Sequence, residues 1–323
     1  MRIVLLLLGF GLAVVHPAEA QQLKNPRVGI VFTGGPRAVA ARIAAFRAGL
    51  NGLGYTEGKN ILIVDRYAEG RLERIPALVN ELVHLKVDVI VSGGPAVTRP
   101  AKEANSTIPI VLGFDNDPVG SGFVASLSRP GGRITGLPSL SPEISGKQLE
   151  LLNEIVPKLS RVAVLGTMTE PGNAQMVKST ELASAVYGLR LQYLEIGDYT
   201  DIETAFRSAN KGRADAALAL TSPITFAHRS LVISAAIKNR LPVTYYSPEF
   251  VEDGGLMTYS VSFTDLFRRA ATYVDKILKG ANPAELPVEQ PAKFEFLINL
   301  KAAKQIALTI PPNVLARADK VIK

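Results

Sequence analysis

The chain has 323 residues and no cysteine, which excludes disulfides and thiolate metal sites. Its length exceeds one ordinary domain and fits two, and an apolar fraction of 47% is sufficient for two cores. The formal net charge is +7, but basic and acidic residues alternate along stretches such as "GRLERIPALVNELVHLK". This pattern is typical of solvated helix faces and argues against a nucleic-acid partner.

The first twenty residues have the features of a secretory signal peptide. A basic start, "MR", precedes the apolar run "IVLLLLGFGLAVV", and Ala18-Glu19-Ala20 supplies the small residues of a cleavage site. The apolar run is shorter than the roughly 20 residues that a spanning helix needs. We therefore expect residues 1–20 to be removed, which leaves a soluble, monomeric periplasmic protein.

From Arg27, short β-branched runs alternate with amphipathic stretches. The expected strands are 27–33, 60–68, 87–94 and 108–114, and the expected helices are 38–54, 72–85 and a segment from about residue 96. The strands are almost continuously apolar, as in parallel sheets whose two faces are both covered by helices. This half of the chain therefore predicts a doubly wound α/β unit.

The same alternation begins again after a segment rich in Gly, Ser and Pro at 132–143. The expected helices are 145–156, 173–188, 201–212 and 230–239, and the expected strands are 161–167, 189–197, 215–222 and 241–247. A strand at 254–261, a long helix at 265–280, a strand at 293–300 and a helix at 301–308 follow, which are too few for a third domain. The fold class is thus α/β, with two Rossmann-like lobes and a multi-segment hinge. We place lobe 1 at 27–138 plus 262–288, and lobe 2 at 139–261 plus 289–323.

Ligands of open α/β sheets bind beyond the carboxyl ends of the strands, where helix N-termini also point. The candidate ligand-binding residues are Thr33, Gly34, Ser92, Gly93, Gly94, Ala96, Phe114, Asp115 and Asn116 in the first unit, and Thr167, Thr221, Ser222, Tyr245 and Ser247 in the second. Hydroxyls and helix N-termini suit a carboxylate, Asp115 suits a cation, and Phe114 or Tyr245 suits an aromatic ring. This set predicts a small carboxylate ligand with an apolar or aromatic body.

The stretch "GFDNDPVGSG" contains two aspartates, whose roles differ. A metal site, an acid–base pair and a polar loop beside a ligand are the three interpretations. Asp117 precedes Pro118, a pattern typical of a helix N-cap, whereas Asp115 lies nearer the strand end. The glycines of "TGGPR" and "SGGPA" match neither a P-loop nor a dinucleotide motif, so they either approach the ligand or only permit tight turns. Tyr245 and Tyr246 point to opposite faces of a strand, so at most one is expected to face the cleft.

Signatures of catalysis are missing from the sequence. His84 and His228 lie in amphipathic stretches away from strand ends, and neither a Gly-x-Ser-x-Gly elbow nor a two-histidine zinc motif occurs. We therefore expect a binding protein with no catalytic residue, no metal and no cofactor.

Several blocks of the chain resemble, in order, the tryptophan/tyrosine-type substrate-binding proteins of ABC transporters. They include "FRAGLNGLGYTEGKNILIVDRYAEG", "STIPIVLGFDNDPVGSGFVASLSRPGGRITGL" and "GGLMTYSVSFTDLFRRAATYVDKILKG". The resemblance implies the type I periplasmic binding-protein fold, closure over a ligand about crossovers near Pro138 and Ser262, and delivery to an ABC permease and ATPase. An aromatic amino acid is the ligand that it suggests first. It supports the capping role of Asp117, and Arg133 departs from it, because family members commonly carry Asn there.

Two other functions share this architecture. An exported two-lobed glycosyltransferase-like enzyme would use Asp115 and Asp117 to hold a metal and a nucleotide sugar, although nucleotide sugars are not periplasmic substrates. A ligand-sensing regulator would carry a helix-turn-helix unit, but none precedes "RVGIVFT".

Expression with export should yield a chain that begins at Gln21, because cleavage is expected after Ala20. The mass of the intact protein from a periplasmic extract would test this. Recovery of the full-length chain from the membrane fraction would contradict the cleavage.

Overall fold

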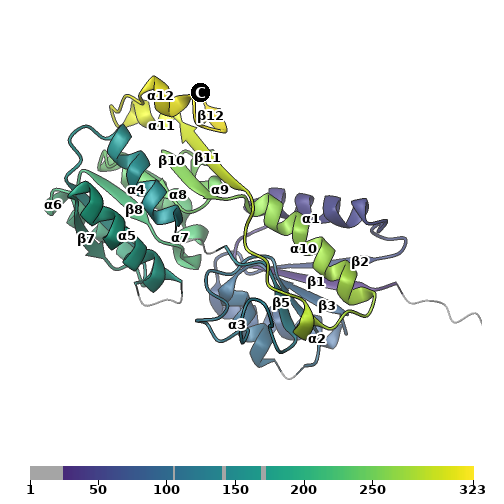
Figure 1. The fold of residues 1–323 in the computed structure, drawn as a ribbon. Coiled ribbons are helices and arrows are strands. Elements are labelled where there is room, and N and C mark those ends of the chain that lie inside the picture. The colour runs from purple at the N-terminus through teal and green to yellow at the C-terminus, as the bar shows by residue number, and fades with distance from the viewer. Residues whose placement is uncertain (1–24, 105, 140–142, 169–171) are drawn as a thin grey trace, which may run out of the picture.

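The computed structural model describes residues 25–104, 106–139, 143–168 and 172–323. These residues form two α/β lobes, each built around its own sheet (Figure 1). The predicted two-lobed α/β fold is thereby confirmed. The predicted signal peptide lies outside the described residues, and within them no helix is long and apolar enough to cross a membrane.

The first lobe contains a five-stranded parallel sheet in the order β2-β1-β3-β4-β5. The strands are β1 (Arg27–Phe32), β2 (Leu62–Tyr67), β3 (Val89–Ser92), β4 (Ile110–Leu112) and β5 (Ile134–Gly136). The helices are α1 (Ala40–Gly52), α2 (Ile75–His84) after the 3-10 turn η1 (Leu72–Arg74), and α3 (Pro95–Glu103). β3 and β4 are buried throughout because helices cover both faces of the sheet.

The second lobe contains a seven-stranded sheet in the order β12-β11-β10-β9-β8-β6-β7. The strands are β6 (Arg161–Leu165), β7 (Arg190–Leu194), β8 (Ala216–Ala219), β9 (Val243–Tyr245), β10 (Met257–Val261), β11 (Phe294–Asn299) and β12 (Lys320–Ile322). The helices are α4 (Glu143–Ile155), α5 (Asn173–Tyr187), α6 (Asp201–Lys211), α7 (Pro223–Ala227), α8 (Arg229–Lys238), α9 (Pro248–Glu252), α11 (Leu300–Gln305) and α12 (Pro312–Leu315). β11 runs antiparallel to β10, whereas the other paired strands are parallel.

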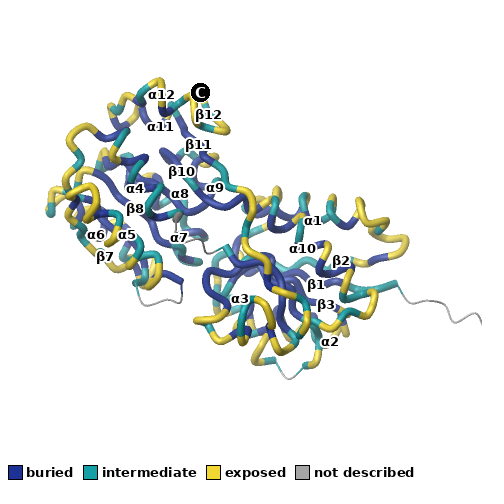
Figure 2. The backbone as a smooth tube through the Cα atoms, viewed as in Figure 1, coloured by how far each residue is buried: buried dark blue, intermediate teal, exposed yellow. Residues whose placement is uncertain are grey.

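The long helix α10 (Phe263–Leu278) leaves the second lobe after β10 and lies along α1 in the first (Figure 1). Ser262 caps its N-terminus, where the Ser262 hydroxyl accepts a hydrogen bond from the Asp265 N–H. The chain then returns past η2 (Pro283–Glu285) to β11 in the second lobe. The central strands of both lobes, such as β3, β4 and β8, are buried throughout, whereas the edge strands β2, β7 and β12 are partly exposed (Figure 2). The residue limits given above for the two lobes stay a prediction.

Arg133 ties the C-terminal end of α3 to the neighbouring strand. Its guanidinium donates to the carbonyl oxygens of Ala101 and Lys102, at 2.8 and 2.9 Å, and to that of Ile108 at 2.8 Å. The last carbonyls of a helix lack partners within the helix, and a cation there also complements the helix dipole. Arg133 therefore supplies a helix C-terminal contact in the first lobe.

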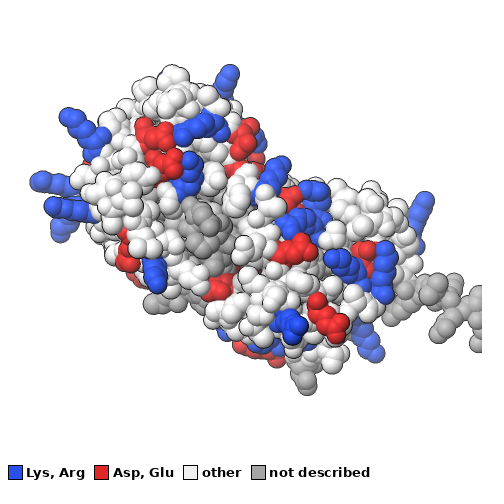
Figure 3. All heavy atoms as spheres, in the orientation of Figure 1, with Lys and Arg blue, Asp and Glu red and all other residues white. Residues whose placement is uncertain are grey.

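Surface charges are dispersed, as expected from the sequence. On the face that Figure 3 shows, basic and acidic side chains lie side by side over both lobes. Lys320 and Glu252 form one of the ion pairs at the protein surface.

Substitution of Gly49 by Ala should destabilise the protein. A Cβ atom at Gly49 would lie 2.5 Å from the Arg268 carbonyl oxygen and 2.8 Å from the Ala271 Cβ, so α10 would have to move away from α1. We expect a loss of about 1–3 kcal/mol in the free energy of unfolding, measured by chemical denaturation. Gly52→Ala in the same helix is the control, because nothing lies within 4 Å of its added Cβ, and it should be neutral or slightly stabilising. Equal stability of the two variants would contradict the close packing of α1 on α10.

Candidate ligand-binding site

A cavity of about 310 Å³ lies between the two lobes. The first lobe contributes the ends of β1 and β4, the start of α3, and side chains from α1 and α10, and the second lobe contributes the segment before α7, α7 itself and Tyr246. Its size is at the lower end of the range for small-molecule sites. Among the residues predicted from the sequence, those that line it are Thr33, Gly93, Gly94, Ala96, Phe114, Asn116, Thr221 and Ser222.

Aromatic rings from both lobes surround a buried guanidinium at one side of the cavity. Arg42 is 3% exposed, and its guanidinium carbon lies 4.1, 5.0 and 5.5 Å from the ring centroids of Phe263, Phe226 and Phe114, respectively. Phe114 and Phe263 contact edge to face at 5.1 Å. Stacking of a guanidinium on aromatic faces is favourable. Here the three rings around Arg42 give the cavity an apolar surface.

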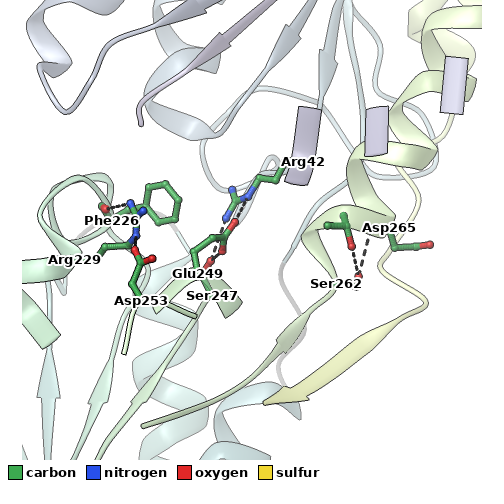
Figure 4. Close-up of polar contacts among 9 residues, drawn as sticks. Arg42, Phe226, Arg229, Ser247, Glu249, Asp253, Ser262 and Asp265 are labelled. Carbon is green, nitrogen blue, oxygen red and sulfur yellow. Dashed lines mark hydrogen bonds and ion pairs between the residues drawn. The ribbon is translucent and has the colours of Figure 1, made fainter. Parts of the chain in front are cut away.

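The same guanidinium joins the two lobes. Its Nε donates to Glu249 Oε1 at 2.6 Å, its Nη2 donates to Ser247 Oγ at 3.0 Å, and the Ser247 hydroxyl donates in turn to Glu249 (Figure 4). Burial alone would raise the pKa of Glu249. The charge and hydrogen bond of Arg42, together with the Ser247 hydroxyl, lower the pKa by more than burial raises it, so it lies below the ordinary value. Arg42 is thus charge-compensated from the opposite lobe.

One predicted residue of the second lobe, Tyr245, has a neighbour that lines the cavity in its place. Tyr245 is 1% exposed and stacks on Phe250 at 4.7 Å, away from the cavity. Tyr246, the next residue, lines the cavity, and its hydroxyl donates to the Ser222 carbonyl at 2.7 Å. The strand ends at Tyr245, and only one of the two rings faces the cleft, as expected.

Other predicted residues support the cavity from behind. The Ser92 hydroxyl contacts the Gly94 carbonyl at 2.9 Å and the Thr98 hydroxyl at 2.7 Å, and so holds the turn into α3. Thr167 donates to the Ile196 carbonyl at 2.9 Å. Gly34 lies beside Phe226, because a Cβ atom at Gly34 would be 3.2 Å from that ring. The cavity lining does not include Ser92, Thr167, Gly34 or Ser247. A direct contact of these four residues with a ligand stays a prediction.

The two aspartates of the "GFDNDPVGSG" stretch both accept hydrogen bonds from the protein, although Asp115 Oδ2 has no partner among the described residues. Asp115 is fully buried, does not line the cavity, and accepts from the Asp117 N–H at 3.0 Å. Its burial raises its pKa to about 7, although the Asp117 N–H and Arg99 oppose the shift. Asp117 accepts from the Gly120 N–H at 2.8 Å and, across the cleft, from Gln175 Nε2 at 2.9 Å. It therefore caps the turn at 118–122, which is not the helix that the sequence predicted.

The carboxyl-end edge of the cavity carries polar groups. The hydroxyls of Thr33, Ser121, Thr221 and Ser222 line it, together with the N-terminus of α3 and Arg99 one turn into that helix. The Ala96 N–H has no backbone acceptor among the described residues, as is usual in a first helical turn. The lining residues within the described part of the chain include two arginines and no carboxylate.

The cavity also includes residues that strand-end reasoning missed. They include Arg42, Arg99, Phe226 and Phe263 on helices, Ser121 in the turn at 118–122, and Tyr246 directly after the predicted Tyr245. Arg42 gives one signal in the sequence, because it is a cation in the apolar stretch "AARIAAF" and its burial requires a partner.

Comparison with known proteins identifies the family. A family model described as ABC transporter substrate binding protein matches residues 29–322. The chain belongs to this family. It is therefore the substrate-binding component of an ABC transporter, in an extracytoplasmic and non-catalytic family, as the sequence blocks indicated. The glycosyltransferase-like alternative is set aside on this ground, and the described residues contain no cluster of three or more His, Cys, Asp or Glu that could hold a metal.

Relatives of this binding protein span most of its length. A tyrosine-binding protein of Clostridioides difficile (strain R20291) is 24% identical over 262 residues, which make up 81% of this chain and 75% of the relative. A conserved domain protein from Vibrio cholerae has a crystal structure with a TM-score of 0.84 at 28% identity, covering 92% of this chain and 100% of that one. An ABC domain from Streptococcus pneumoniae in complex with L-Trp also gives a TM-score of 0.84, at 23% identity, covering 93% and 100%. At that identity the last likeness shows the fold alone.

Glu249→Gln should destabilise the binding protein by about 3–5 kcal/mol near pH 7, because the substitution leaves Arg42 buried without a counter-ion. Since the folded-state pKa of Glu249 is depressed, its contribution is present above the ordinary glutamate pKa of about 4.3 and is lost as the pH falls through the folded-state value. Chemical denaturation at pH 7 and at stepwise lower pH would measure this. The difference in the free energy of unfolding between wild type and variant should become smaller as the pH is lowered.

Glu252→Gln in the same helix is the matched control. Glu252 pairs with Lys320 at the surface, where the side chains are 43% and 55% exposed, so we expect a loss of less than about 1 kcal/mol. If the two variants lost equal stability, the buried Arg42–Glu249 pair would contribute no more to the free energy of unfolding than an exposed ion pair.

Proposed function

We propose that this ABC transporter component captures a small carboxylate with an aromatic or apolar body in the interlobe cavity and presents it to the permease. An aromatic amino acid is the first candidate, which the tyrosine-binding relative and the L-Trp complex also suggest. The main support is the aromatic lining that both lobes contribute around Arg42. Such a lining is suited to a planar ring.

The ring of the ligand would pack against Phe114, Phe226 and Phe263. These side chains are held in place by Arg42 and by one another, so little conformational entropy is lost when a ring binds. Arg42 itself is occupied by Glu249 and Ser247, so its role is to support the wall of the cavity.

The carboxylate of the ligand would bind at the polar groups of the cavity. The Ala96 N–H at the start of α3, the hydroxyls of Thr221 and Ser222, and Arg99 all lie there. Helix N-termini favour negative charge, and the lining has no carboxylate that would repel it among the described residues. Asp115 lines neither the cavity nor the space next to it, so it would contact a ligand cation only after rearrangement.

The transport cycle follows from this placement. Half-sites from two lobes become one enclosed pocket only when the lobes close about the segments that cross between the sheets, and the permease would read the closed form. Export to the periplasm as a monomer completes the proposal.

Arg99→Gln should weaken binding of an aromatic carboxylate about tenfold, or about 1.4 kcal/mol, because a charge-assisted contact to the carboxylate is lost. Calorimetric titration with L-tryptophan, L-tyrosine and L-phenylalanine would measure it. Arg207→Gln removes the same charge from α6, away from the cavity, and should leave the affinity unchanged.

Small-angle scattering on the same samples should show compaction when a ligand binds. The proposal fails if none of these ligands binds the wild type, or if Arg99→Gln and Arg207→Gln have the same affinity.

A further inference from the structure

A small side chamber opens next to the aromatic cavity. The two share Asn116, Thr221, Tyr246 and Phe263 in their linings. The chamber has a volume of about 30 Å³ and is otherwise lined by residues that include Ser139, Gln148 and Ser260. This volume is sufficient for one or two water molecules, so the chamber admits a small group and no ring.

Gln148, on α4, lines this chamber, and its amide oxygen has no partner among the described residues. The residue is fully buried, and its Nε2 donates to the Tyr259 carbonyl at 2.9 Å and is 3.4 Å from the Tyr245 carbonyl. Both neighbours are acceptors, so the amide nitrogen must face them, and the orientation of the amide group is fixed. Oε1 then faces away from these carbonyls and has no partner among the described residues.

Ser260, on β10, provides a second unpaired group in the same chamber. It is 2% exposed, and its Oγ has no hydrogen-bond partner within the described part of the chain. The Ser139 hydroxyl, in contrast, already contacts the Asp115 carbonyl at 3.1 Å and Asn116 Oδ1 at 3.2 Å. A buried polar atom without a partner is destabilising, so two of them beside a ligand cavity require an explanation.

We propose that the side chamber receives a hydrogen-bond donor of the bound carboxylate, with Gln148 Oε1 as the acceptor and Ser260 Oγ as a second partner. This inference rests on the proposed function and adds a requirement to it. The ligand carries a small donor group, an ammonium or a hydroxyl, next to its carboxylate. The chamber lining contains no charged side chain among the described residues, so either donor satisfies it. Recognition of the donor thus depends on Gln148 and Ser260, and Asp115 has no part in it.

The test is calorimetric titration of the full chain with three ligands that share a ring and a carboxylate. L-tryptophan carries an ammonium, indole-3-lactate carries a hydroxyl at the same carbon, and indole-3-propanoate carries neither. We expect the first two to bind the wild type at least tenfold more tightly than the third. Gln148→Met should remove most of this preference while it leaves the affinity for indole-3-propanoate nearly unchanged.

Two further variants separate recognition from folding. Ser260→Ala removes one partner and keeps both contacts of Gln148 Nε2, so it should reduce the same preference. Thr244→Val is the matched control, because the Thr244 hydroxyl is also buried and unpaired within the described residues but does not line the chamber. It should leave the preference intact.

The outcomes distinguish this inference from the function on which it rests. If none of the three ligands binds the wild type, both fall. If all three bind with equal affinity, the aromatic carboxylate site stands, and the chamber holds only water. If Gln148→Met and Ser260→Ala weaken all three ligands by the same factor, the two residues are structural and the side-chamber assignment is overturned.

Discussion

The buried guanidinium of Arg42 is the constraint on which the arrangement of the two lobes depends. A cation that is 3% exposed must be compensated, and its compensation comes from Glu249 and Ser247 in the opposite lobe. The pair therefore specifies how the lobes meet while it adds little net free energy to their closure.

Much of the fold could be predicted from the sequence, because burial on both faces of a parallel sheet leaves a distinct pattern. The apolar runs at 27–33, 87–94 and 161–167 all became strands, and the long helix after Ser262 formed as expected. About half of the predicted binding residues line the cavity for the same reason, since parallel strands place their carboxyl ends along one edge. Short elements such as β5 and α9 have too few residues to show a period.

The remainder of the cavity depended on tertiary packing that no local pattern contains. Phe226 and Phe263 reach the cavity from helices, and their neighbourhood exists only once the chain has crossed between the lobes twice. Tyr246 and not Tyr245 faces the cleft because β9 ends at Tyr245, and a shift of one residue reverses the direction of a side chain. The Gln148 Oε1 lacks a partner because the amide nitrogen faces the carbonyls of Tyr245 and Tyr259, and these contacts form only in the tertiary structure.

Arg133 shows how a residue remote from the cavity can control it. Its guanidinium holds the last carbonyls of α3, and the first turn of the same helix supplies Ala96 and Arg99 to the cavity. α3 is only nine residues long, so the anchored carbonyls lie within two turns of the residues that line the cavity. A substitution at Arg133 would therefore act on the placement of Ala96 and Arg99 while every side chain of the cavity lining stays the same.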